Sequence, residues 1–182
     1  MLILRDFLLS SPAQIKNNMD LQATKTQAEL DEMFMRMALQ EARAAAADGE
    51  VPVGAVIVCK GRVLARTHNL TERLTDVTAH AEIQAITAAA SALGGKYLPD
   101  CTLYVTVEPC PMCAGALGWA QIGRIVYGAD DPKRGYSRLA LSTHSLPTSP
   151  ILHPRTQVVS GVLADECAAL IRDFFKERRP TL

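Results

Sequence analysis

Apolar residues recur at the spacing of an amphipathic helix near both ends of the chain. In residues 27–49, which end in a glycine, the apolar positions three and four residues apart are Leu30, Met33, Phe34, Met37, Ala38 and Ala44. Residues 164–178 show a second pattern of this kind. Between them, an alanine-rich helix is expected from Thr78, a candidate N-cap, to residue 93, where two glycines follow. A short helix is expected over residues 111–120, with a proline in its first turn.

Five further segments have the composition of strands. Residues 53–59 are apolar and are joined to residues 62–66 by a Lys-Gly turn, which predicts a hairpin. Residues 101–107 alternate β-branched and apolar side chains, and residues 122–127 and 157–162 predict two more strands. Strands interleaved with helices in this order predict a three-layer α/β/α domain around a central mixed five-stranded sheet.

Two segments fall outside this regular pattern. Residues 1–27 lack a clear period, and we expect a poorly ordered N-terminal extension there, followed by one domain over residues 28–182. Residues 130–153 are rich in Ser, Pro, Gly and Arg, which predicts a long loop, and loops of this length are usually functional or disordered.

Composition excludes several classes of protein. No apolar run approaches the roughly 20 residues of a membrane span, and Asp6 interrupts the apolar start, which argues against a secretory signal. The five cysteines are odd in number and include one tight pair, which favours a metal site in a reducing compartment, the cytoplasm, over a disulfide framework.

Charge gives no global sign of a nucleic-acid-binding protein. The 19 basic residues balance the 19 acidic ones, whereas such proteins usually carry a basic excess. Contact with nucleic acid would therefore need a local patch, and a solvated basic face is the alternative interpretation. The candidates for such a patch are Lys133, Arg134, Arg138, Lys176, Arg178 and Arg179.

One constellation carries candidate chemistry. His80-Ala81-Glu82 lies at the start of one expected helix, and Pro109-Cys110-Pro111-Met112-Cys113 opens another. A Cys-x-x-Cys pair at a helix start can offer two thiolates to a tetrahedral ion, and His80 as third ligand leaves the fourth position open, as in catalytic zinc sites. Glu82 could reach a bound water and act as general base and acid. This is the known signature of zinc nucleobase deaminases, H-x-E followed by P-C-x-x-C.

Other interpretations fit parts of this constellation. A Cys-x-x-Cys pair alone could be a redox pair, but no thioredoxin-like context surrounds it. A structural zinc site would need a fourth ligand, and the nearest thiol in sequence, Cys101, lies inside an expected strand. A histidine such as His80, taken alone, is more often a core or capping residue.

At these residues the chain resembles the cytidine deaminase superfamily and, within it, the bacterial tRNA-specific adenosine deaminases. The resemblance extends from about residue 27 to residue 179. The segments that carry it are Glu50–Val56, His68-Asn69, Thr78–Glu82, Thr102–Cys110, Gly128–Lys133, Gly161–Cys167 and Phe174-Phe175. It implies a cytidine deaminase-like fold, one Zn²⁺ per subunit held by His80, Cys110 and Cys113, and Glu82 as proton shuttle. A homodimer that acts on a tRNA anticodon stem-loop is also implied.

The resemblance further implies a set of substrate contacts. Asn69 would hydrogen-bond the purine, although Asn is also common in turns. Asp131 and Lys133 would contact RNA beside the flipped base, or simply form a polar turn. Phe175 would pack near the nucleic acid, or against the sheet. The complete set is Asn69, Ala81, Pro109, Asp131, Lys133, His153 and Phe175.

Two departures from the family pattern concern the substrate. The chain has His153-Pro154-Arg155 where the bacterial tRNA enzymes commonly have Asn-His-Arg, so His153 replaces an Asn that contacts the base. An imidazole still donates or accepts a hydrogen bond, but in a narrower pattern than an amide. In addition, Trp119-Ala120 after the second cysteine resembles guanine deaminases of the same superfamily.

Three functions are therefore compared. The leading one is hydrolytic deamination of wobble adenosine to inosine in a tRNA anticodon, favoured by the final helix and the long loop. The alternative is a deaminase of a free nucleobase (guanine, cytosine or adenine), which would need no basic rim. The third is a non-catalytic zinc-binding partner subunit, and the presence of Glu82 argues against it.

Overall fold

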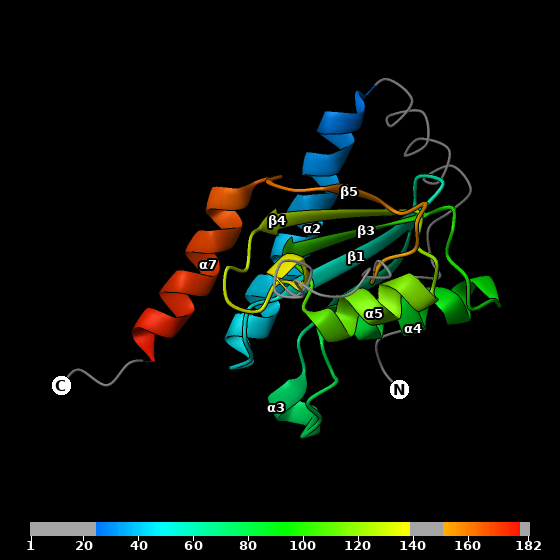
Figure 1. Cartoon of the computed structure of the whole chain (residues 1–182). Coiled ribbons are helices and arrows are strands. Elements are labelled where there is room, and N and C mark those ends of the chain that lie inside the picture. The colour runs from blue at the N-terminus through cyan, green and yellow to red at the C-terminus, as the bar shows by residue number, and fades with distance from the viewer. Residues whose placement is uncertain (1–24, 139–150, 179–182) are drawn as a thin grey trace, which may run out of the picture.

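A mixed five-stranded sheet lies between two layers of helices in the computed structural model, which describes residues 25–138 and 151–178 (Figure 1). The elements are α2 (Gln27–Ala47), β1 (Gly54–Cys59), β2 (Arg62–His68), α3 (Thr71–Leu74), α4 (Ala81–Leu93), β3 (Cys101–Val107), α5 (Pro111–Trp119), β4 (Arg124–Ala129), β5 (Gln157–Val159) and α7 (Ala164–Glu177). The strand order is β2-β1-β3-β4-β5. The predicted three-layer α/β/α domain is confirmed.

The sheet is mixed because its two halves are connected differently. Strand β1 pairs antiparallel with β2 and β3, whereas β3, β4 and β5 are parallel. Lys60 and Gly61 join β1 to β2, and both have positive φ (49° and 76°), the combination that matches the twist of a two-residue hairpin. Helix α5 makes the crossover from β3 to β4, as parallel neighbours require.

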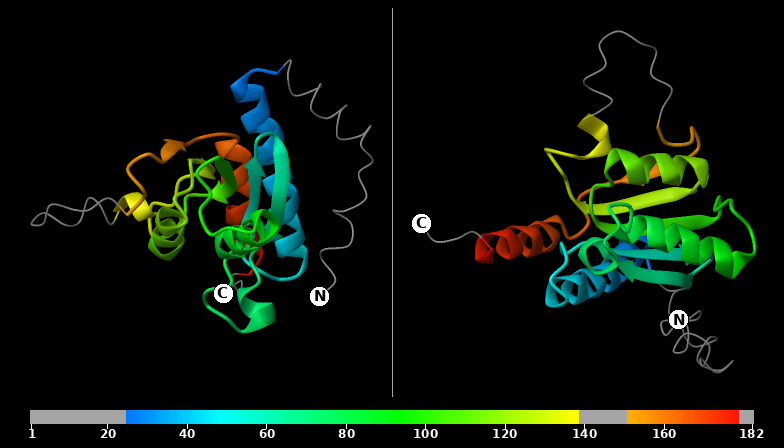
Figure 2. Two further views of the ribbon diagram at one scale, coloured as in Figure 1. Left: turned by 90° about the vertical axis from the view of Figure 1, so that its right-hand side faces the viewer. Right: turned by 90° about the horizontal axis from the view of Figure 1, so that it is seen from below.

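Each face of the sheet has its own apolar core. Helices α4 and α5 cover one face, and α2 and α7 cover the other (Figures 1 and 2). Side chains of β3 alternate between the two cores. The first core includes Ala85, Leu103, Leu117 and Ile125, and the second includes Phe34, Tyr104, Val126 and Cys167.

Strand β3 has the predicted boundaries, whereas β1 begins one residue later and β2 ends two residues later than the sequence predicts. Strands β4 and β5 differ more. Strand β4 begins at Arg124 rather than at residue 122. The two preceding residues, Ile122 and Gly123, belong to the turn after α5, because their backbone N–H groups donate to the carbonyl oxygens of Leu117 and Leu98. Strand β5 spans three residues instead of six. Helix α3 lies between β2 and α4, where the sequence pattern predicts neither a helix nor a strand.

The prediction of Thr78 as an N-cap is wrong. Helix α4 begins at Ala81, and its N-cap residue is His80. The Thr78 hydroxyl and backbone N–H both donate to the Asp76 carboxylate, at 2.7 and 2.8 Å. A local turn held by a side chain competes with helix capping in this way.

Helix α2 starts where the sequence places it, with a capping box formed by Thr26 and Glu29. The predicted boundary between residues 27 and 28 thus falls at the first residue of this helix. Residues 1–24, most of the expected extension, lie outside the described residues, as do residues 139–150 of the expected long loop. Within the described part, no helix has the length and apolar character to cross a bilayer.

The close approach of β1 to α2 depends on a glycine. A Cβ atom at Gly54 would collide with backbone atoms of Ala38 and Ala42. The Gly54 N–H also donates to the Thr106 hydroxyl at 3.2 Å, which ties the start of β1 to β3. These contacts fix the segment immediately before β1, which includes Glu50.

Candidate metal centre

Two helix starts meet at one edge of the sheet and bring the candidate ligands together. His80 is the N-cap residue of α4, and Cys110 is the N-cap residue of α5, three residues after the end of β3. The Nδ1 atom of His80 lies 3.7 Å from the Sγ of Cys110 and 3.5 Å from the Sγ of Cys113. All three candidate ligand atoms lie within 4.8 Å of one another. The predicted constellation therefore forms one cluster.

The spacing of these atoms fits a zinc ion. Zinc–nitrogen and zinc–sulfur bonds of about 2.0 and 2.3 Å at tetrahedral angles require a nitrogen–sulfur separation of roughly 3.5 Å. Both observed separations agree with this value. Two thiols and one imidazole are a donor set typical of zinc, and three protein ligands leave a position for water.

The surroundings of the Cys110 thiol favour the thiolate form that binds a metal ion. Bonds from the Cys113 thiol and the His80 ring lower the pKa of the Cys110 thiol to about 4. The N-terminus of α5 also favours a thiolate at this position. The bond to Cys110 and burial raise the pKa of the Cys113 thiol, so this side chain must release a proton when it becomes a metal ligand.

Glu82 lies beside the ligand cluster in the first turn of α4. Its side chain is buried, with 3% exposed, and burial raises the pKa of its carboxyl. It lies close enough to Cys113 to contribute to the raised pKa of that thiol. Glu82 is thus an acid–base group in contact with a candidate metal ligand, as a proton shuttle requires.

The start of α4 is held against the end of β2. The Thr67 hydroxyl donates to the carbonyl oxygen of Ala81 at 2.7 Å. Gln84 Nε2 donates to the carbonyl oxygens of His68 and Ala79 at 2.7 and 3.1 Å. Ala81, a predicted substrate contact, is fully buried at this junction.

The backbone at Asn69 lies close to the segment that carries His80. The N–H of the following residue, Leu70, bonds to the carbonyl of Ala79, which adjoins His80. The Asn69 side chain is 5% exposed, and its Nδ2 donates to the carboxylate of Glu50 at 3.1 Å. Glu50 is a residue that the sequence did not identify as part of the site.

A second buried carboxylate, Glu108, holds the loop that carries Asp131 and Lys133. Its oxygens accept hydrogen bonds from the N–H groups of Asp131 and Ser137, both at 3.1 Å. The Asp131 carboxylate in turn accepts the N–H of Lys133 at 2.9 Å. Because Glu108 stands two residues before Cys110, it connects this loop to the metal ligand.

Pro109 completes this connection. It is buried, and its carbonyl oxygen accepts the N–H of Tyr136 at 3.0 Å. Both Pro109 and the loop that follows β4 are therefore near the cluster. Neither Glu50 nor Glu108 stood out in the sequence, where each acidic residue simply precedes an apolar strand or a proline.

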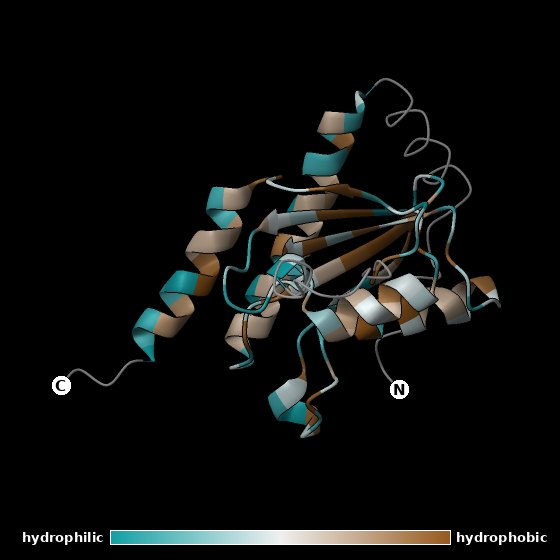
Figure 3. Ribbon diagram, in the orientation of Figure 1, coloured by the Kyte–Doolittle hydropathy of each residue, from teal (hydrophilic) through white to brown (hydrophobic). Residues whose placement is uncertain are grey.

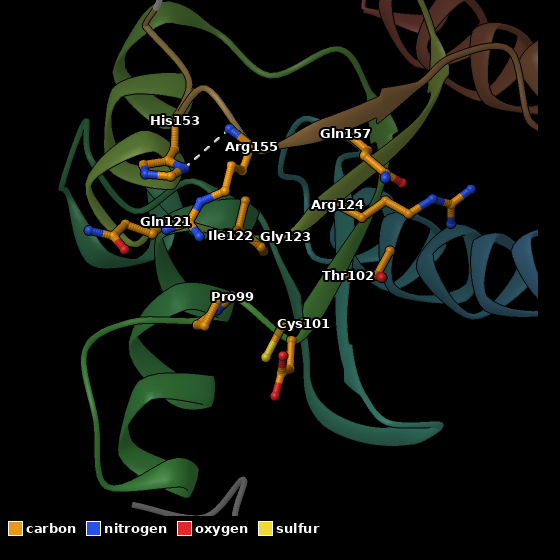
Figure 4. Close-up of a pocket in the computed structure, with 11 residues that line it drawn as sticks. Pro99, Cys101, Thr102, Gln121, Ile122, Gly123, Arg124, His153, Arg155 and Gln157 are labelled. Carbon is orange, nitrogen blue, oxygen red and sulfur yellow. Dashed lines mark hydrogen bonds between the residues drawn. The ribbon is translucent and has the colours of Figure 1, made fainter.

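His153 is not among the residues that the structure brings to the metal cluster. It lines a pocket of about 580 Å³ together with Pro99, Cys101, Gln121 and Arg155 (Figure 4). This pocket lies where β3 and β4 begin, whereas the cluster lies beyond the end of β3, which is roughly 20 Å away for a strand of this length. The His153 Nδ1 accepts the N–H of Arg155 at 3.3 Å, which makes His153 a turn residue.

Phe175 lies on an exposed side of α7. Its ring is 46% exposed and meets the buried Phe174 ring edge-on, with the ring centres 5.4 Å apart. It therefore does not form part of the core, which was the alternative to a role near RNA. The guanidinium of Arg178 lies over the Phe174 ring, 4.0 Å from the ring centre. Arg179 of the candidate basic patch lies outside the described residues.

Comparison with known proteins agrees with this geometry. Residues 28–129, more than half of the chain, match the family described as the cytidine and deoxycytidylate deaminase zinc-binding region. The tRNA-specific adenosine deaminase of Agrobacterium fabrum (strain C58) is 50% identical over 146 residues, which cover 80% of this chain and 94% of that protein.

Solved structures of both kinds of deaminase share the fold, and the sequence identity is higher for the tRNA deaminase. A structure from a study of A-to-I editing by tRNA:A34 deaminases at the wobble position of transfer RNA has a TM-score of 0.69 at 49% identity, and the match covers 76% of this chain and 98% of that one. The guanine deaminase of Bacillus subtilis has a TM-score of 0.55 at 33% identity, over 67% of this chain and 82% of that one.

Proposed function

Because the chain belongs to the family of cytidine and deoxycytidylate deaminases, we propose that it hydrolyses the amino group of the wobble adenosine in a tRNA anticodon. Water enters at the purine carbon that bears the amino group, ammonia leaves, and inosine remains. The observation that carries the proposal is the His80, Cys110 and Cys113 cluster beside buried Glu82, in a chain that is 50% identical to a tRNA-specific adenosine deaminase.

His80, Cys110 and Cys113 would hold one zinc ion per chain. When bound, the ion lowers the pKa of a water molecule to about 7 and so supplies a nucleophile at neutral pH. The Glu82 carboxylate takes the proton from the attacking water. It would pass this proton to the adjacent ring nitrogen, then take the second proton from the oxygen that is now bonded to the purine carbon and transfer it to the departing amino group, which leaves as ammonia.

The groups around the cluster would bind the flipped base and its neighbours. Asn69, Ala81 and Pro109 would border the base, which must leave the stack of the anticodon loop to reach Glu82. Asp131 and Lys133 would contact the adjacent RNA from the loop held by Glu108. A contact of His153 with RNA would lie outside this base pocket, because His153 lies where β3 and β4 begin, and a contact of Phe175 would come from the exposed side of α7.

A homodimer is supported by the outer face of α5. This helix contains no charged residue (Figure 3), although its exposed side includes Met112, 39% exposed, and Trp119, 86% exposed. Gly115 and Ala116 lie between them on the same stripe, and the neighbouring α4 has no charged residue after Glu82. A helix that is apolar all round is normally buried, and a second copy of this chain would cover it.

We propose the cytoplasm as the location of this activity, because the tRNA substrate is found there. All five cysteines are free thiols in the structure, as expected in a reducing compartment.

The substrate is tested with the purified protein and two kinds of substrate. One is an anticodon stem-loop with adenosine at the wobble position, and the other is the set of free bases guanine, adenine and cytosine. We expect inosine and ammonia from the stem-loop, and no product from a stem-loop with guanosine at that position. Release of ammonia from free guanine alone would contradict the proposal. Glu82→Ala is expected to abolish the reaction, and full activity of this variant would contradict the assigned mechanism.

Removal of the metal gives an independent prediction. Dialysis against a chelator is expected to remove about one zinc per chain, abolish deamination and lower the melting temperature, because the ion binds only the folded ligand set. Added zinc should restore all three properties. Metal analysis and thermal unfolding measure the outcome, and activity that persists in zinc-free protein would contradict a catalytic ion.

A further inference from the structure

Glu50 is a buried carboxylate at the centre of a hydrogen-bond network beside the metal cluster. Its side chain is fully buried in the segment between α2 and β1. One oxygen accepts the Arg73 N–H at 2.8 Å. The other accepts the Glu72 N–H and Asn69 Nδ2, both at 3.1 Å, and the Thr71 hydroxyl at 3.3 Å. The network therefore joins Asn69 to the start of α3.

The network determines which way the Asn69 amide faces. Burial raises the pKa of the Glu50 carboxyl, but the four hydrogen bonds that it accepts together lower the pKa below its usual value. An ionised carboxylate only accepts hydrogen bonds, so the part of Asn69 that faces it must be the NH₂ group. The same Nδ2 also reaches the Thr71 Oγ1, at 3.0 Å. Both amide protons are thus used within the protein.

This leaves the carbonyl oxygen of Asn69 for another partner. Within residues 25–138 and 151–178, no group donates to Asn69 Oδ1, and every fully buried side-chain nitrogen or oxygen there has a partner. Oδ1 is therefore not fully buried, although Asn69 as a whole is only 5% exposed. The backbone at this residue lies close to Ala79, which precedes His80, because the Leu70 N–H bonds to the Ala79 carbonyl.

We propose that Glu50 is a positioning residue that presents Asn69 to the target nucleoside as a hydrogen-bond acceptor. The partner would be a hydroxyl or amino donor of that nucleoside. The inference rests on the proposed function, since it assigns a role in binding the same substrate. It also predicts that Glu50 never touches the substrate and acts only through Asn69 and the start of α3.

A double-mutant cycle tests this inference. Glu50→Gln and Asn69→Ala are each expected to lower kcat/KM for the adenosine stem-loop by roughly 10- to 100-fold, the loss typical of one hydrogen bond to a charged or buried group. If Glu50 acts through Asn69, the kcat/KM of the double variant is expected to be no lower than that of the less active single variant. A loss equal to the product of the two single losses would overturn the inference.

Asp31→Asn provides the matched control. Asp31 is another buried carboxylate, 5% exposed, but it bonds to Arg124 and Tyr104 on the other face of the sheet. Its effect on kcat/KM, measured well below the melting temperature, should multiply with that of Asn69→Ala. Thr71→Val covers the case in which Glu50→Gln does not fold, since it keeps the Glu50 carboxylate and removes one donor to it together with the second acceptor for Asn69 Nδ2. Its loss should also disappear in the Asn69→Ala background, and a multiplied loss would overturn the inference.

A spectroscopic readout separates this inference from the proposed function. The Asn69 side-chain NH₂ protons should exchange slowly with solvent in the zinc-loaded wild type, and faster in Glu50→Gln. An inactive wild type would refute the proposed function while this measurement still tests the orientation of Asn69. An active wild type with equal exchange rates in both proteins would refute the positioning role alone.

Discussion

Glu50 and Glu108 have the same structural role near the metal cluster, since each holds a loop in place. Each is a buried carboxylate that accepts backbone N–H groups from a loop, at Glu72 and Arg73 in one case and at Asp131 and Ser137 in the other. A buried charge is unfavourable unless it is hydrogen-bonded. Movement of either loop would therefore expose the carboxylate or leave it buried without hydrogen-bond donors. The residues expected to touch substrate are therefore held by groups that do not touch it.

Gly135→Ala tests the role of Glu108 at this scale. A Cβ atom at Gly135 would collide with the Glu108 carboxylate and lie 2.7 Å from the carbonyl oxygen of Asp131. The loop must then shift, and we expect kcat/KM for the stem-loop to fall by about 10-fold or more, with zinc content unchanged. Gly95→Ala, where a Cβ meets nothing within 4 Å, is the control and should retain full activity. Equal activity of the two variants would contradict the role of this loop.

At the scale of elements, a buried ion pair ties α2 to the sheet. The Asp31 carboxylate on α2 accepts hydrogen bonds from both terminal nitrogens of Arg124 on β4, at 2.7 and 2.6 Å. It also accepts a hydrogen bond from the Tyr104 hydroxyl on β3, at 2.9 Å. Burial raises the pKa of the Asp31 carboxyl, but the hydrogen bonds from Arg124, Gln27 and Tyr104 together lower it below its usual value. The pair thus joins three elements at one point.

The pH dependence of this pair has a definite sign. A carboxyl whose pKa is lower in the folded state contributes stability above its unfolded pKa of about 3.9, and this contribution is lost as the pH falls through the folded pKa. Asp31→Asn leaves Arg124 without its carboxylate and should lower the free energy of unfolding at pH 7 by about 3–5 kcal/mol. In urea denaturation, the difference from wild type should shrink below about pH 4. A constant difference from pH 7 to pH 3 would contradict this account.

At the scale of the whole molecule, the topology brings the chemistry to one edge and leaves an apolar layer outside. Helices α4 and α5 both begin at the metal cluster and run side by side over the same face of the sheet (Figure 1). Their inner sides fill one core, while the outer side of α5 has no charged residue. An assembly of two chains through this layer would bury it and support the helix that carries Cys110 and Cys113.

Trp119→Lys tests the assembly. The Trp119 side chain is 86% exposed, so its replacement costs the single chain little packing but places a charge in the proposed interface. We expect a dimeric mass for the wild type and a monomeric mass for the variant in light scattering. Val77→Lys, at a residue 83% exposed outside α5, should leave the mass unchanged. A monomeric wild type, or a dimeric Trp119→Lys, would contradict the interface.

The metal ligands and the secondary structure were predictable because they depend on local patterns. Cys110 and Cys113 are one helical turn apart, and Glu82 follows His80 by two residues, so short segments contain the geometry. The order of strands and helices likewise follows from hydrophobic period. The boundaries of β4 and the N-cap of α4 were missed, because hydrogen bonds to Leu98 and Asp76 override propensity there.

The sequence by itself therefore determined the layers, the ligand set and the class of chemistry. Only the tertiary structure decided how Asn69 is oriented, which loops Glu50 and Glu108 hold, and that His153 lies at the far edge of the sheet. The hydrogen bonds of Glu50 and Glu108 join residues 19 to 29 positions apart. The place of His153 is set by strands that come from other parts of the chain. A pattern along the chain does not encode such contacts, because they exist only after the sheet has fixed which segments are neighbours.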